Sequence, residues 1–229
     1  SAIFYFVLMM GLMALLLLFS VGSTINQYTS PNSANVLSDT LALIKNSIVN
    51  IVSVGVASGL LYGIVFCFIT IAPSMVMQQF GLSKTMFSIY SLFATLCFVV
   101  GSLTNIRLAA IATITKFKLS SIFILGLSLL FCLVTIGTGD AELIAILIYC
   151  YIAFFFIRIA MPCSVTMILG FSKTSAGFLA ALTGFFHLTG AAAGAYFVTL
   201  FTAGPTLSFS VTTMALSMGS VVICVFIRK

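Results

Sequence analysis

Long, nearly uncharged apolar segments run through this chain and constrain its fold more than any other feature. A helix needs about 20 apolar residues to span a bilayer, and inside the hydrocarbon core only helices and closed barrels satisfy the backbone. Charged residues make up 5% of the 229 positions, against roughly 25% in soluble domains. The sequence therefore predicts an all-α, polytopic membrane protein with seven transmembrane helices, at residues 2–22, 51–77, 85–104, 119–137, 143–170, 177–201 and 207–227.

One connection, at residues 23–50, is longer than the others. Its first part is polar and contains Pro31, so we expect a cytoplasmic loop there. Its second part repeats aliphatic residues at the spacing of one helical face, namely Leu37, Leu41, Ile44 and Ile48. This pattern predicts a short amphipathic helix on the membrane surface, although the same residues could also be the start of the next span.

The basic residues predict an orientation, because cytoplasmic loops carry an excess of lysine and arginine. With the N-terminus outside, Lys84 lies outside together with the acidic Asp140 and Glu142. Seven basic residues then lie inside: Lys45, Arg107, Lys116, Lys118, Lys173, Arg228 and Lys229. We therefore expect a cytoplasmic C-terminus, with Asp140 and Glu142 in a solvated turn.

Composition excludes several classes of function. The net charge of +6 is spread singly between apolar runs, with no basic and aromatic patch for nucleic acid. All six cysteines fall inside apolar runs without a CxxC pair, which is typical of small buried residues. No cofactor or metal is expected, because one histidine and three acids are too few for a metal site.

Arg158 is the only charge deep within a predicted span. An arginine at the centre of a span costs roughly 2.5–3.5 kcal/mol on insertion scales, so it should face a bundle interior or a wet cavity. Tyr151, Phe155 and Pro162 share its helix face, and Pro162 frees a backbone carbonyl. We predict a substrate surface here; the alternative is a structural arginine that pairs with carbonyls.

His187 is the sole histidine and lies in a span rich in small residues. It could shuttle protons or simply hydrogen-bond within a packed interface. Gly190 and Gly194 form a small-xxx-small pattern that lets helices approach closely.

The span at 51–77 carries Ser58, Tyr62 and Phe66 near one face, with Pro73 positioned to kink its outer end. This aromatic, hydroxyl-bearing face suits a cavity lining as well as plain core packing.

No catalytic constellation occurs in the sequence, so we do not expect an enzyme. A retinal protein is excluded because the span at 207–227 holds no lysine for a Schiff base. A seven-helix receptor or assembly factor stays as a rival, although the last six spans are closely spaced and only the first is set apart.

The order of one helix, a long connection and six helices resembles helices six to twelve of the major facilitator superfamily. Short motifs are similar to its bicyclomycin-resistance-type drug–proton antiporters: Ala72-Pro73-Ser74, Gln79-Phe80-Gly81-Leu82-Ser83, Phe87-Ser88, Gly101-Ser102, Asn105-x-Arg107-Leu108, Pro162, Ala176-Gly177, Ala181-Leu182 and Gly184. His187 stands where that family often has glutamine, and Cys163 replaces an asparagine.

The resemblance implies that residues 1–22 end an N-terminal half and that 51–229 form the C-terminal half-transporter bundle. The spans at 51–77 and 143–170 would line a central cavity, and those at 119–137 and 207–227 would face lipid. The implied function is secondary active transport of a small organic solute by alternating access, as proton-driven multidrug export across a bacterial inner membrane. An importer of a metabolite or osmolyte is the alternative. The implied partners are the solute, a coupling proton, the bilayer and the missing N-terminal half.

Overall fold

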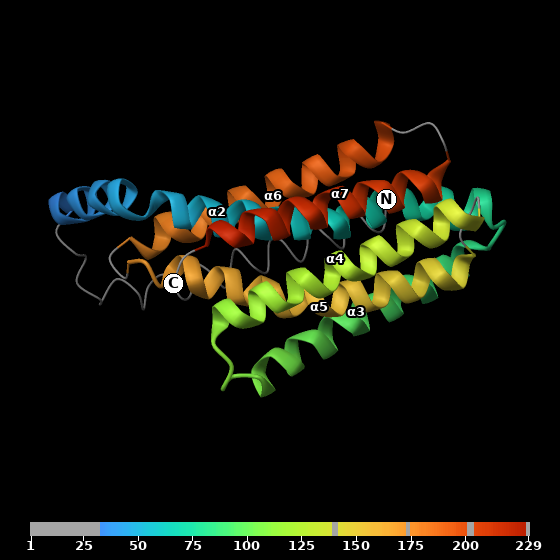
Figure 1. Ribbon diagram of the computed structural model, residues 1–229, viewed down its shortest axis with the longest axis horizontal. Helices are drawn as coiled ribbons and strands as arrows, with labels where there is room; N and C mark the ends of the chain where they lie inside the picture. Colours follow the sequence, from blue (N-terminus) through green and yellow to red (C-terminus); the bar gives the residue numbers. More distant parts are fainter. Residues whose placement is uncertain (1–32, 139–141, 173–174, 201–203, 228–229) are drawn as a thin grey trace, which may run out of the picture. The chain divides into compact units, whose positions relative to one another are not determined.

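The computed structural model describes residues 33–138, 142–172, 175–200 and 204–227, with side chains from residue 47 onward (Figure 1). The described part is all-helical, in the order α2 (Ser33–Ser74), the π-helix η1 (Met75–Gln79), α3 (Lys84–Arg107), α4 (Thr113–Thr138), α5 (Leu143–Leu169), α6 (Ala176–Leu200) and α7 (Pro205–Phe226). Six helices in this part are long and apolar enough to cross a membrane. They confirm the last six predicted spans; the span predicted at 2–22 lies outside the described residues.

Helix α2 begins earlier than the predicted span and is unbroken from Ser33 to Ser74. Residues 37–48 therefore continue directly into the span instead of forming a separate helix, because no proline or glycine interrupts the sequence there.

The C-terminal end of α2 changes pitch after Pro73. Proline has no N–H for the helical ladder, and the following turn is wound as η1, where the Phe80 N–H donates to the Met75 carbonyl over 3.2 Å. Gly81 then adopts a φ of 63°, a left-handed conformation that favours glycine and ends the element. The kink expected at Pro73 thus takes the form of a π-turn, a feature that occurs frequently at functional sites.

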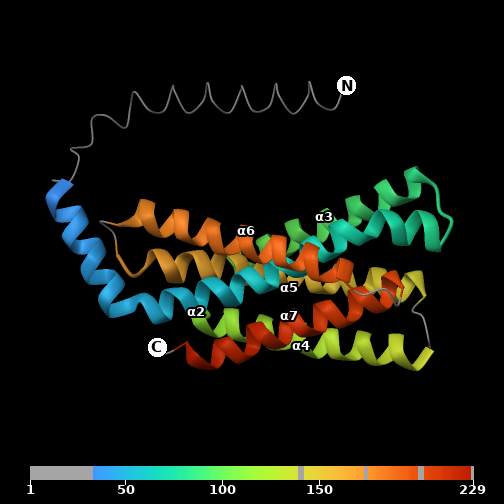
Figure 2. The same cartoon turned by 90° about the horizontal axis from the view of Figure 1, so that it is seen from above.

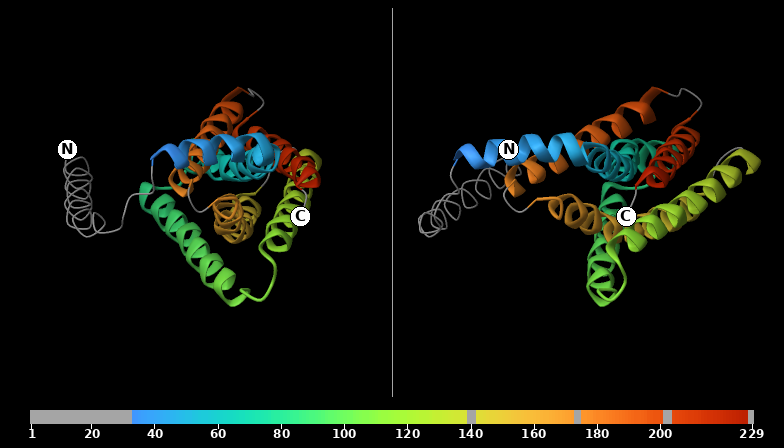
Figure 3. Two further views of the ribbon diagram at one scale, coloured as in Figure 1. Left: turned by 90° about the vertical axis from the view of Figure 1, so that its left-hand side faces the viewer. Right: turned by 60° about the vertical axis from the view of Figure 1, so that its left-hand side comes forward.

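Two helices, α2 and α5, form the centre of the compact unit at residues 42–229. In its most apolar stretch α2 is 67% buried, whereas α3 is 11% buried. Seen end-on, α5 lies between α3 and α4 (Figure 3, left). The rings of Phe68 on α2 and Phe154 on α5 meet edge to face at 5.5 Å, so the two central helices touch.

The helices form two triplets, α2–α4 and α5–α7. The first helix of each triplet, α2 or α5, packs against helices of the other triplet. Helix α2 contacts α6 at Gly59 and Gly190 and contacts α7 where Ser220 donates to the Ala57 carbonyl. Helix α5 packs against α3 and α4. Because successive helices alternate in direction, the two triplets have opposite orientations (Figure 2).

Buried hydroxyl residues line the region where α4 packs against α7. They recur every seven residues on α4, at Ser121, Ser128 and Thr135, and every three or four residues on α7, at Thr206, Ser210, Thr213, Ser217 and Ser220. Many of them donate to carbonyls of their own helix, as Ser121 does to Phe117 and Ser217 to Met214. Small, internally satisfied side chains let helices approach without an unpaired polar group in the membrane.

The outward surface of the helices is strongly apolar. Large side chains are more than half exposed on several helices, among them Leu103, Leu130, Leu133 and Val225. Such a continuous apolar surface would aggregate in water but is the normal lipid-facing surface of a membrane bundle.

Replacing Tyr149 with phenylalanine should reduce stability only slightly. The buried Tyr149 hydroxyl is 3.0 Å from Ser128 Oγ. Interhelical hydrogen bonds in membrane proteins are worth about 0.6 kcal/mol on average, and Ser128 can turn to a carbonyl of its own helix. We expect a loss of about 0.5–1.5 kcal/mol in reversible unfolding in mixed micelles, and no loss for Tyr196→Phe, because Tyr196 is exposed. A loss above about 3 kcal/mol would contradict this role.

Candidate functional site

Tyr62, Arg158 and His187, three of the predicted site residues, line one open hollow of about 450 Å³. They come from α2, α5 and α6 respectively. The rest of the lining belongs to α5: Met161, Pro162, Val165 and Thr166. With Arg158 these residues follow the i, i+3, i+4, i+7, i+8 spacing of a single helix face, so one stripe of α5 forms a wall of the hollow.

The Arg158 side chain is held by α3. Its Nε donates to Ser102 Oγ over 2.7 Å, and the Ser102 hydroxyl donates to the Phe98 carbonyl over 3.0 Å. Gly101 makes this contact possible, because a Cβ there would lie 2.6 Å from the Phe155 carbonyl oxygen and 3.0 Å from Arg158 Cβ. The close approach of α3 and α5 thus fixes the plane of the guanidinium.

The positive charge of Arg158 has no nearby carboxylate in the described part of the chain. Glu142, the one acidic side chain described there, caps the same helix sixteen residues earlier, about 24 Å along the axis. Both Nη groups are without a protein partner among the described residues. Pro162, four residues on, supplies no N–H to the Arg158 carbonyl. The guanidinium therefore offers most of its hydrogen-bonding capacity to the hollow.

His187 is fixed by α2. Its Nε2 lies 3.1 Å from Ser58 Oγ, and the fully buried Ser58 donates its own proton to the Gly55 carbonyl over 3.0 Å. Since a hydroxyl has one proton to give, Ser58 accepts here and Nε2 carries the hydrogen. The imidazole also lies 5.5 Å from the Tyr62 ring, centroid to centroid. Nδ1 is then left as the free acceptor of the ring.

The other predicted site residues lie beside the hollow. Phe66 packs against the ring of Tyr62 at 5.3 Å. Tyr151 shares the helix face of Arg158 but lies two turns away, about 10 Å along the axis, where its hydroxyl donates to the Tyr90 carbonyl over 3.2 Å. Phe155 packs its ring against Phe156 and its carbonyl against α3. The Tyr151 hydroxyl and the Phe155 carbonyl thus contact α3, and neither residue lines the hollow.

Several residues of this site were not singled out from the sequence. Ser102 was noted only as part of a family motif, and the apolar side chains Met161 and Val165 carry no signal by themselves. Their periodic spacing from Arg158 along α5 is the one feature that could have identified them.

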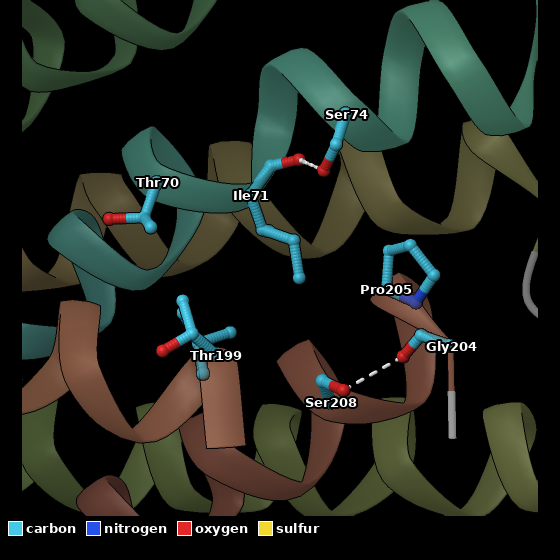
Figure 4. Close-up of a pocket in the computed structure, with 8 residues that line it drawn as sticks. Thr70, Ile71, Ser74, Thr199, Gly204, Pro205 and Ser208 are labelled. Carbon is cyan, nitrogen blue, oxygen red and sulfur yellow. Dashed lines mark hydrogen bonds between the residues drawn. The ribbon is translucent and has the colours of Figure 1, made fainter. Parts of the chain in front are cut away.

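A second hollow of about 290 Å³ lies between α2, α6 and α7 at the opposite end of α6 from Ala176 (Figure 4). It is lined by Thr70, Ile71, Ser74, Val198, Thr199, Gly204, Pro205 and Ser208. Three of its hydroxyls are satisfied locally: Ser74 donates to Ile71, Thr199 to Tyr196 and Ser208 to Gly204. Without a charged side chain in its lining, this hollow is a weaker candidate for binding a solute.

Cysteines and metal ligands add no further site in the described residues. The six thiols are free; five are buried as expected, and Cys97 is partly exposed. No group of three potential metal ligands occurs in the part of the chain that the structure describes.

The chain matches no protein-family model, and no curated protein sequence matches it. The resemblance of its motifs to a transporter family therefore stays an expectation from the sequence.

Proposed function

We propose that this chain belongs to a secondary transporter that moves a small organic solute by alternating access. Helices α2–α7 form one half of this transporter. The observation that carries the proposal is the hollow that contains Tyr62, Arg158 and His187. Each of the three comes from near the middle of its candidate membrane span: position 16 of 33, 16 of 27 and 12 of 25. Secondary transporters bind substrate near the bilayer midplane, at the interface between repeats.

The arrangement of the helices supports the same function. Two triplets with opposite orientations, whose central helices α2 and α5 meet, are typical of the inverted repeats in transporter halves. The hollow lies on α2 and α5, which the family resemblance assigns to the cavity lining, and α4 carries large exposed apolar side chains as expected for a lipid-facing helix.

The direction of transport and the driving ion belong to the proposal through the resemblance. We propose proton-driven export across a bacterial inner membrane, with a cytoplasmic C-terminus; solute import by the same fold is the alternative. Within the described residues, Arg107, Lys116 and Lys118 lie at one end of the bundle and Lys84 and Glu142 at the other, an asymmetry consistent with this orientation.

The test is solute flux in liposomes that contain the purified full-length gene product. We expect an imposed pH gradient to drive accumulation of at least one solute from a panel of small organic compounds, and a protonophore to abolish it. Protein-free liposomes and liposomes with heat-inactivated protein are the controls. A receptor or assembly factor would give no flux above these controls with any solute, and that result would overturn the proposal.

A further inference from the structure

The polar groups in the Arg158 hollow are cationic or neutral, and its described lining contains no acid. We propose that the solute is a small organic anion whose carboxylate binds the Arg158 guanidinium. The inference rests on the proposed function and narrows its substrate class. It also departs from the drug-exporter resemblance, because a hollow with an unpaired cation repels cationic compounds.

The geometry of Arg158 selects how the anion binds. The Nε–H of Arg158 already donates to Ser102 Oγ, so the guanidinium edge formed by Nε and Nη2 is not free to bind a carboxylate with both N–H groups. The end edge, formed by Nη1 and Nη2, has no protein partner among the described residues. Two parallel N–H groups on one planar edge match the two oxygens of a carboxylate. A structural arginine would instead place these donors on backbone carbonyls, and no such bond is found in the described part of the chain.

Two further polar groups have unused hydrogen-bonding capacity in the same hollow. The Tyr62 hydroxyl has no hydrogen-bond partner among the described residues, and His187 Nδ1 is free because Ser58 holds Nε2. Tyr62 can donate to an oxygen of the solute, whereas Nδ1 accepts from a hydroxyl or amide. Such groups orient a ligand that the main charge contact holds.

The remainder of the lining is apolar and shapes the rest of the solute. Met161, Pro162 and Val165 present hydrocarbon surface along α5. An inorganic anion would leave this surface unused, whereas an organic acid would cover it with its carbon skeleton. The chemistry therefore points to an amphipathic carboxylate.

The experiment measures thermal stabilisation of the purified full-length protein in detergent by matched solutes. The probes are benzoate, hexanoate and succinate, each with amides and amines of the same carbon skeleton. We expect at least one carboxylate to raise the melting temperature in a saturable way, and its amide and amine to have no effect. Arg158→Ala should weaken the apparent Kd by about 10- to 100-fold, with Arg158→Lys intermediate because lysine keeps the charge and loses the fork.

The matched control is Arg107→Ala, the same change at an exposed arginine at the end of α3, which should bind the carboxylate like the wild type. If Arg158→Ala does not fold, Arg158→Lys carries the comparison. Stabilisation by the amines or amides, an unchanged Kd in the folded Arg158 variants, or no stabilisation by any carboxylate would overturn the inference. If only neutral or cationic solutes were transported, the transporter proposal would hold and the inference of an anionic solute would be wrong. Arg158-dependent carboxylate binding without flux of any solute would remove the transporter proposal and keep the anion site.

Discussion

Replacing Gly190 with leucine is expected to abolish the folded protein, and alanine at this position should already cost about 3 kcal/mol or more. A Cβ at Gly190 would overlap the carbonyl oxygen of Gly59, and one at Gly194 would overlap that of Gly63. The obstacle is backbone on the facing helix, which no rotamer change can move. To accept even a methyl group, α2 and α6 would have to separate along the whole contact.

The measurement is the yield of monodisperse protein and its unfolding free energy in mixed micelles. Gly184→Ala is the matched control, because it lies on the same helix and a Cβ there meets nothing within 4 Å. In a helix interior alanine is favoured over glycine by about 1 kcal/mol, so Gly184→Ala should be neutral or stabilising. Equal stability of the Gly190→Ala and Gly184→Ala proteins would show that the helices do not meet as described.

This glycine contact also determines the geometry of the hollow. His187 lies one turn before Gly190, and Ser58 lies next to Gly59, so the same close approach brings Nε2 within 3.1 Å of the Ser58 hydroxyl. Packing of α2 against α6 and positioning of the imidazole are therefore one structural feature, and a variant that separates the helices would also misplace His187.

The described spans could be predicted because length and hydropathy are local properties of the sequence. Four of them, α3, α5, α6 and α7, begin and end within a few residues of the prediction. Helix α4 begins at Thr113 rather than at 119, because the lysines at 116 and 118 lower the local hydropathy at its start. The start of α2 could not be fixed, because an amphipathic segment that continues into a span has the same periodicity as one that stops before it.

The residues of the site could be predicted as candidates, and the family resemblance assigned two of their spans to one cavity, but the contacts that bring the side chains together could not be predicted. Arg158 and His187 stand out because charged and titratable residues are rare in apolar helices. Which of them converge depends on which helices are neighbours, and this is decided by contacts such as Gly59 with Gly190 that lie far apart in sequence. Phe155 shares a helix face with Arg158 but is not among the residues that line the hollow; its ring packs against Phe156.

Water access to position 158 is the second large effect that we expect. If the hollow is a solute site, it must be wet in at least one state of the transporter although it lies near the middle of the bilayer. A cysteine introduced by Arg158→Cys should then react with a charged, membrane-impermeant thiol reagent. The background is a full-length protein in which the six cysteines of this chain, and any others in the polypeptide, are replaced by serine or alanine.

Ile122→Cys is the control that separates a wet cavity from a lipid-facing surface. Ile122 is 56% exposed and lies near the middle of α4, at position 10 of 26. It lines an open groove between α4 and α5 whose lining is entirely apolar. The proposed transporter predicts fast modification of Arg158→Cys, from either side of the membrane as the two states exchange, and no modification of Ile122→Cys. If no reagent reaches position 158 from either side, or if position 122 reacts equally fast, the hollow is not a solute pathway.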